Sequence, residues 1–120
     1  KLNNEELPPL AKLCGCEGDE TSQLQQLATE HQLQCVALTK GADGAVLVRG
    51  DEVSVEPAIA TSVADTVGAG DAFTAALTLG LLTGRDLETI NRDAARLAAF
   101  VCSQPGATPT LPAALLSWAV

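Results

Sequence analysis

The first third of the chain carries two stretches whose apolar residues recur at helical spacing. The first covers residues 5–14, where a Pro pair is tolerated in the first turn and Gly15 gives a stop signal. A second helix is predicted to begin at Asp19 or Thr21 and to end near Leu33. Its predicted apolar stripe consists of Leu24, Leu27, Ala28 and His31.

Short apolar runs separated by turn residues follow these helices. Residues 35–39 form an uninterrupted apolar run, which predicts a strand buried on both faces, as parallel strands are. Asp-Gly and Gly-Asp pairs separate this run from 45–48 and 53–55, so hairpin-like connections and an antiparallel margin of the sheet are expected. One more short strand is predicted at 58–63. The pattern as a whole predicts an α/β fold.

The second half of the chain predicts two longer helices. Apolar residues recur every four positions from Phe73 to Leu81 in a stretch that is apolar almost all round, so this helix is expected to be buried. Asp86 can cap the next helix. The predicted apolar stripe of that helix is Ile90, Ala94, Leu97 and Val101, and its predicted water-facing residues are Asn91, Arg92, Asp93 and Arg96. A loop at 103–109 and a short helix at 112–118 complete the prediction.

Composition narrows the class of protein. The chain has 120 residues, of which 47% are apolar, and this is enough for one packed core. Its formal net charge of -8 repels nucleic-acid phosphates and anionic membranes, and 2% aromatic residues leave no platform on which bases could stack. Nucleic acid and membrane surfaces are therefore not expected as partners.

Three further features bear on location and completeness. No apolar run reaches the roughly 18 residues that span a bilayer, and the N-terminus lacks a secretory segment, so a cytoplasmic protein is expected. The chain contains no methionine, which predicts a piece of a longer protein. The cysteines are expected to be buried free thiols, and with one histidine they do not complete a zinc site: Cys14, Cys16, Cys35 and Cys102.

The segment Gly68-Ala69-Gly70-Asp71 carries the strongest chemical signal. Two glycines and an alanine leave the first N–H groups of a helix uncovered, which creates an anion site, and an adjacent aspartate suits proton abstraction from a hydroxyl. The spacing matches neither the dinucleotide fingerprint nor a Walker loop. On these residues alone a tight turn with a helix-end acid explains the segment equally well.

Residues 65–73, Asp-Thr-Val-Gly-Ala-Gly-Asp-Ala-Phe, closely resemble the C-terminal signature of PfkB, or ribokinase-like, carbohydrate kinases, most of all that of fructokinases. The resemblance continues in order through 1–6, 39–44 and 106–109. It implies a ribokinase-like fold, a Rossmann-like layered sheet with helices on both faces, of which this chain is the C-terminal half only. The portion that holds most sugar-binding residues and the lid is absent from it, so the isolated chain is expected to be inactive.

The resemblance implies transfer of the γ-phosphoryl group of ATP to a hydroxyl of fructose or a similar sugar. Asp71 would be the general base, and the backbone N–H groups of Gly68, Ala69 and Gly70 would stabilise the transferring phosphoryl group. The resemblance also implies that Asn3 and Glu6 influence a Mg²⁺ ion through water molecules. The alternative is that these two residues are simply polar residues at the start of a helix.

Further roles follow from the same resemblance. Thr39, Gly41 and Gly44 would face the nucleotide, with plain turn glycines as the alternative. The family often places Asn or His against the adenine where this chain has Ala94 and Ala95, which leaves the base preference open. A monovalent cation such as K⁺ would be bound by Asp65, Val67, Val101, Gly106 and Thr110. A cap or turn role explains Asp65 equally well.

Two properties of the whole protein stay open at this point. The rival function is a non-catalytic, kinase-like module that binds a nucleotide or a protein partner, and the presence of Asp71 beside an intact anion site favours the enzyme. The resemblance is compatible with a homodimer of the full-length protein.

Overall fold

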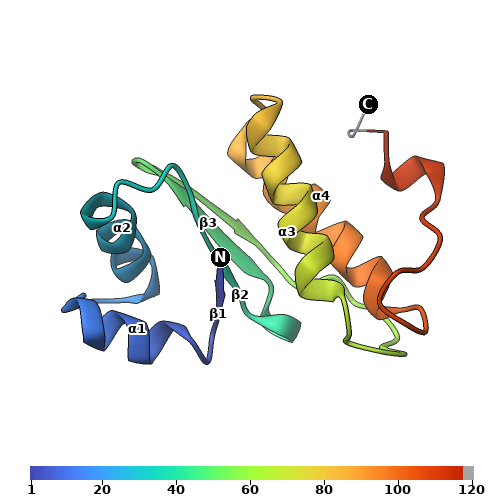
Figure 1. Cartoon of the computed structure of the whole chain (residues 1–120), viewed down its shortest axis with the longest axis horizontal. Helices are drawn as coiled ribbons and strands as arrows, with labels where there is room; N and C mark the ends of the chain where they lie inside the picture. Colours follow the sequence, from blue (N-terminus) through green and yellow to red (C-terminus); the bar gives the residue numbers. More distant parts are fainter. Residues whose placement is uncertain (118–120) are drawn as a thin grey trace. The chain divides into compact units, whose positions relative to one another are not determined.

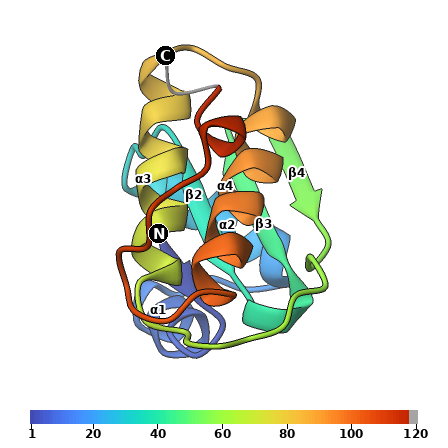
Figure 2. The same ribbon diagram turned by 90° about the vertical axis from the view of Figure 1, so that its right-hand side faces the viewer.

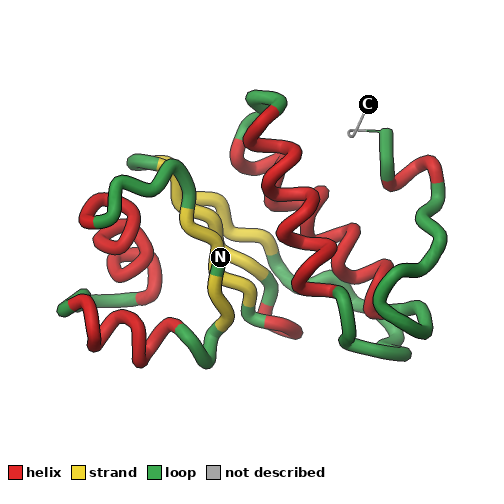
Figure 3. The backbone as a smooth tube through the Cα atoms, viewed as in Figure 1, coloured by secondary structure: helices red, strands yellow, loops and turns green. Residues whose placement is uncertain are grey.

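The computed structural model describes residues 1–117 and divides the chain into two compact units. The N-terminal unit comprises residues 1–57, and the C-terminal unit begins at residue 58. All the strands described fall in the N-terminal unit, and the two longest helices described fall in the C-terminal unit (Figure 3). The α/β class predicted from the sequence is confirmed.

Sequence signals mark the start of both helices of the N-terminal unit and the end of the first helix. Helix α1 (Leu7–Cys14) has proline in its first positions and ends at Gly15, which adopts the left-handed conformation with φ 66°. Helix α2 (Glu20–Glu30) is capped by Asp19, whose Oδ1 accepts the Ser22 N–H at 2.8 Å.

The end of α2 differs from the prediction. The helix ends at Glu30, before Leu33, and His31 is exposed just beyond it, so His31 does not belong to the buried stripe. Its Nε2 lies 3.7 Å from Sγ of Cys14. The chain turns out of the helix at Gln32, which adopts the left-handed conformation with φ 53°, and the Leu33 N–H donates back to the Ala28 carbonyl at 2.8 Å.

The sheet contains four strands in the order β1-β2-β3-β4: Leu2–Asn3, Val36–Thr39, Ala45–Arg49 and Glu52–Glu56. Strand β1 runs parallel to β2, and β2, β3 and β4 are antiparallel to one another. The antiparallel margin is therefore confirmed. The two-residue strand β1 was not predicted, because so short a run shows no periodicity.

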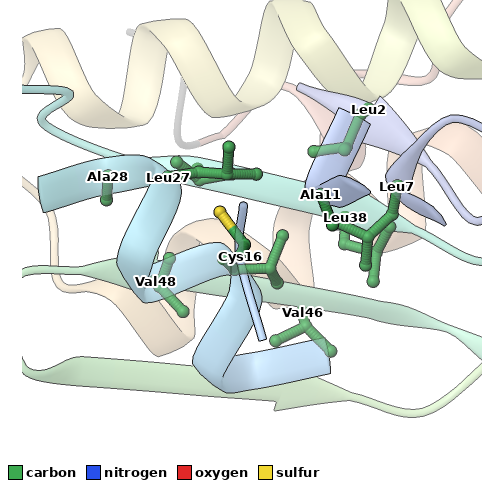
Figure 4. Packing of buried hydrophobic residues seen from close by; sticks show 11 residues of the cluster. Leu2, Leu7, Ala11, Cys16, Leu27, Ala28, Leu38, Val46 and Val48 are labelled. Atoms are coloured by element: carbon green, nitrogen blue, oxygen red, sulfur yellow. The ribbon is translucent and has the colours of Figure 1, made fainter. Parts of the chain in front are cut away.

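The core of the N-terminal unit lies between the sheet and its two helices. Alternate residues of β2 and β3 point to the same side as α1 and α2, and Figure 1 shows both helices on that side. Leu38 stands opposite Val46 in the register, and Val36 stands opposite Val48. Figure 4 shows Leu38, Val46 and Val48 of the sheet in one cluster with helix side chains, among them Leu7, Ala11, Leu27 and Ala28.

The C-terminal unit is built on two helices packed side by side, α3 (Ala69–Leu82) and α4 (Leu87–Cys102) (Figure 2). Asp86 caps α4 through the Thr89 N–H at 2.8 Å, as predicted. A Cβ at Gly80 would lie 2.7 Å from Cγ1 of Ile90, so the glycine permits this close packing. The predicted stripe of α4 is buried.

Several predictions in and around this unit are corrected. Asn91 is fully buried, because it lies four residues after Leu87 and three before Ala94, on the inner face of α4. Helix α3 is not buried all round, since Leu82 is 79% exposed. Residues 58–63 are exposed and form no strand. The backbone hydrogen bond that follows them runs from the Ala64 N–H to the Cys102 carbonyl at 2.8 Å. An isolated apolar run without a strand partner cannot satisfy its backbone groups in a sheet.

The remaining corrections concern short segments. The helix predicted at 112–118 is a single 3₁₀ turn, η2 (Ala113–Leu115), and Trp118 lies outside the described residues. The four cysteines are free, but of these thiols only that of Cys16 is buried, and burial raises its pKa. Within residues 1–117 no helix has the length and apolar character needed to cross a bilayer.

Candidate active site

The start of α3 requires glycine at position 68. Gly68 precedes the helix with φ 83°, a conformation that side chains other than glycine rarely adopt. A Cβ at this position would lie 2.5 Å from the carbonyl oxygen of Ala107. The loop containing Ala107 therefore packs directly on the start of the helix, a contact that sequence reasoning missed although it singled out Gly106.

The N-terminus of α3 offers unused hydrogen-bond donors. No side chain of residues 1–117 caps this end, and the first helical bond runs from the Ala72 N–H to the Gly68 carbonyl at 2.9 Å. The Ala69 N–H bonds the Thr66 carbonyl at 3.4 Å, but within the described chain the Gly70 N–H donates to no acceptor. These donors and the helix dipole together can hold an anion.

Asp71 stands in the first turn of this helix, beside those donors. Its side chain is exposed, and no ion pair or hydrogen bond among residues 1–117 engages its carboxylate. An aspartate whose oxygens are unoccupied can accept a proton from a neighbouring hydroxyl. The candidate base and the anion site thus share one turn of helix.

Asp65 ties two loops of the C-terminal unit together. Its Oδ1 accepts the Val67 N–H at 2.9 Å, and its Oδ2 accepts the Gly106 N–H at 3.3 Å. Asp65 therefore fulfils the turn role named as its alternative, and it also brings Val67 and Gly106 into one cluster. The Val101 carbonyl at the end of α4 accepts the Gln104 N–H at 3.1 Å, and Thr110 is exposed further along the loop.

The N-terminal unit carries a second group of candidate residues, at the carboxyl ends of its parallel strands. Asn3 at the end of β1 stands directly opposite Thr39 at the end of β2. In sheets with parallel strands, ligands bind beyond these carboxyl ends. The structure thus places Asn3, predicted for magnesium, beside Thr39, predicted for the nucleotide.

Asn3 and Glu6 are bonded reciprocally. The Asn3 Oδ1 accepts the Glu5 and Glu6 N–H groups, both at 2.9 Å, and the Glu6 Oε2 accepts the Asn3 N–H at 2.8 Å. This arrangement resembles a capping box and leads the chain from β1 into α1. The helix-start alternative for these residues is therefore realised, while Glu6 Oε1 takes part in no bond within residues 1–117.

The turn after β2 is held by its own backbone. The Lys40 N–H donates to the Gly44 carbonyl at 2.8 Å, across the short 3₁₀ turn η1 (Gly41–Asp43). Gly44 combines φ 93° with ψ -149°, a conformation that only glycine adopts readily. Lys40 also pairs with Glu20 at 3.0 Å, which fixes the turn to α2.

One of the two alanines expected to lie against the adenine is not available. Ala94 is fully buried in the apolar stripe of α4, so its side chain cannot contact a nucleotide. The neighbouring Ala95 is half-buried and remains a candidate.

A model of pfkB family carbohydrate kinases matches residues 1–114. The chain belongs to this family. It is similar to an uncharacterized sugar kinase of Archaeoglobus fulgidus, with 40% identity over 84 residues that make up 69% of this chain and 33% of that protein.

Solved structures of similar proteins agree with a ribokinase-like fold. Adenosine kinase from Sinorhizobium meliloti matches with a TM-score of 0.75 and 31% identity over 92% of this chain and 32% of that one. Arabidopsis thaliana ribokinase complexed with ribose and ATP matches with a TM-score of 0.73 and 30% identity, over 97% of this chain and 38% of that one. The chain thus spans about a third of the length of the pfkB relatives it matches.

Proposed function

We propose that this chain is the nucleotide-binding, base-bearing C-terminal portion of an ATP-dependent carbohydrate kinase that phosphorylates a primary hydroxyl of fructose or a similar sugar. One observation carries the proposal: the unengaged carboxylate of Asp71 stands in the first turn of a helix whose donors are open. A purely structural helix-end acid would not need uncapped N–H groups beside it.

The proposed reaction follows from these groups. Asp71 accepts the proton of the sugar hydroxyl while a bond forms between its oxygen and the γ-phosphorus, and the bond from that phosphorus to ADP breaks. The N–H groups of Gly68, Ala69 and Gly70 stabilise the charge on the transferring group. Thr39, Gly41, Gly44 and Ala95 are proposed to face the nucleotide.

Two cations fit the residues present. Glu6 keeps one carboxylate oxygen outside its bond to Asn3, which suits contact with a hydrated Mg²⁺ through water. Bound Mg²⁺ neutralises charge on nucleotide phosphates. Asp65 holds the loops of Val67 and Gly106 together through their N–H groups. A monovalent cation such as K⁺ is proposed to bind at this cluster through Asp65, Val67, Val101, Gly106 and Thr110.

The decisive test is Asp71→Asn in the full-length enzyme, with sugar-dependent ADP release as the readout. Turnover should fall by roughly 10²–10⁴-fold, the usual contribution of a positioned base, while nucleotide affinity changes little. Glu88→Gln is the matched control, because Glu88 is also an exposed acid in the first turn of a helix. Equal turnover of both variants would overturn the base role.

The isolated chain provides a second check. It should release no ADP in the presence of sugar, because phosphoryl transfer needs a site that orients both substrates and excludes water. If the full-length protein also bound ATP without phosphorylating any sugar in a panel, the non-catalytic binding module would be the better description.

A further inference from the structure

A cleft lined with arginine lies on the C-terminal unit. It has a volume of about 300 Å³ and lies between the first part of α4 and the segment around η2, which run beside each other in Figure 2. Its lining residues are Arg85, Arg92, Asp93, Arg96, Ala114, Leu115 and Ser117. The sequence pattern alone assigns most of these charged residues simply to a water-facing side.

The charge of this cleft is opposite to that of the protein. The formal net charge of the chain is -8, yet every basic residue after position 57 lines this cleft. The single acid in the lining, Asp93, pairs with Arg85 at 2.8 Å and is 12% exposed. Three guanidinium groups and one carboxylate leave the lining with two net positive charges.

Arg92 and Arg96 carry that excess. They lie four residues apart, so they project from the same face of α4, and like charges at this spacing repel. The Arg92 guanidinium donates to the Thr89 hydroxyl at 3.4 Å, and its charge also interacts with the Asp86 carboxylate outside the lining, while Arg96 is exposed. An anion placed between the two arginines would remove the repulsion and would be bound by planar, charged donors.

We propose that this cleft binds the phosphate group of a small molecule. A phosphate dianion matches the two net positive charges, and its oxygens match the fork of N–H donors that each guanidinium presents. Arg85, held by Asp93, forms a fixed wall of the site, while Arg92 and Arg96 supply the main contacts.

This site is separate from the proposed kinase site. Arg85 lies in the connection after the C-terminal end of α3, whereas Gly68 and Asp71 lie at the N-terminal end of that helix. No residue that lines the cleft belongs to the proposed kinase site. The phosphate proposal therefore does not depend on the proposed function.

The test is a titration of the complete chain followed by NMR of the arginine Nε–H groups. Inorganic phosphate is added at an ionic strength held constant with sodium chloride. The Nε–H signals of Arg92 and Arg96 should move saturably. A parallel titration with phenyl phosphate identifies the source: tighter binding points to an organic phosphate ester, and equal binding points to the phosphate group alone.

Variants assign the binding to the cleft. Arg92→Gln and Arg96→Gln should each weaken phosphate binding about tenfold, because each removes a charged donor. Arg96→Lys keeps the charge but loses the planar fork, and should weaken binding less. Lys12→Gln, an exposed basic residue of α1, is the control and should have no effect.

Stability gives an independent readout. Phosphate should raise the melting temperature of the wild type, and this rise should disappear in Arg96→Gln, which without phosphate should be at least as stable as the wild type. Movement of the Gly70 amide signal alone would place phosphate at α3 and overturn the proposal. Signals that move without saturation, or equally in the glutamine variants, would also overturn it.

Discussion

The two units hold their candidate functional side chains in different ways. In the N-terminal unit, Asn3 and Glu6 are bonded to each other's backbone and shape the passage from β1 into α1. In the C-terminal unit, the carboxylate of Asp71 has no hydrogen bond or ion pair among residues 1–117, and its helix begins at a glycine without a side-chain cap. Both groups belong to segments that carry the family resemblance.

The two units thus show two ways in which a functional side chain can be held in position. Asn3 and Glu6 are oriented by the same bonds that stabilise the fold, so their loss affects stability as well as any ligand. The position of Asp71 is set by backbone geometry, so its carboxylate can be removed without removing a structural bond. Variants in the two units should therefore give different combinations of stability and activity.

The largest effect on stability is expected at the backbone that positions Asp71. Gly68→Ala should lower the free energy of unfolding by about 2–4 kcal/mol, because it adds left-handed strain and a collision with the Ala107 backbone. Urea unfolding of the chain measures this loss.

Gly106→Ala is the matched control for that substitution. Gly106 has φ 81°, but nothing lies within 4 Å of the position of its missing Cβ. It should therefore cost only the conformational part, about 1–2 kcal/mol. Equal losses at the two glycines would show that the contact with Ala107 does not matter for stability.

A smaller effect on stability should distinguish the two units directly. Asn3→Ala should lower the free energy of unfolding by about 0.5–2 kcal/mol, because the Glu5 and Glu6 N–H groups lose their side-chain acceptor. Asp71→Asn should change it by less than about 0.5 kcal/mol, since no bond is lost. The comparison between units fails if Asp71→Asn proves as destabilising as Asn3→Ala in the same unfolding experiment.

The smallest expected effect concerns a feature that the units share. Backbone N–H bonds lower the pKa of Asp19, which caps α2, and the pKa of Asp86, which caps α4. Each carboxylate therefore stabilises the fold at pH values above its pKa in the unfolded chain, about 3.9. This contribution is lost as the pH falls toward the lower pKa of the folded state.

The pH dependence of the melting temperature tests this. Between about pH 5 and pH 2 the melting temperature of the wild type should fall more steeply than that of Asp19→Asn combined with Asp86→Asn. Each single variant should flatten the curve partly, one in each unit. Asp51→Asn, an exposed acid in the turn between β3 and β4, should leave the slope unchanged.

Much of the fold could be predicted because its signals are local. Gly15, Asp19 and Asp86 mark helix ends through bonds to residues within the next turn or the last one, and these positions are confirmed. The predictions fail where a segment's structure depends on partners far along the chain. The run 58–63 looks like a strand by composition, but no strand of the described chain pairs with it.

The candidate site was predictable to a similar extent. The segment 68–71 was found from small residues beside an acid, and it does begin a helix. The contact between Gly68 and Ala107 joins residues 39 positions apart, and no periodicity signals it. Ala94 belongs to the apolar stripe of α4, and this place already predicts a buried side chain that has no contact with a nucleotide.

The outer strand of the sheet carries its own protection against self-association. Among the strands described, β4 has only β3 as a sheet neighbour, and the side chains of Val53 and Val55 are 42% and 67% exposed. If two copies paired antiparallel about Ser54, Glu52 of each copy would face Glu56 of the other. Like charges directly opposite destabilise such a ladder. The two glutamates therefore act as gatekeeper residues that oppose pairing between the edge strands of two copies, the first step of aggregation at such an edge.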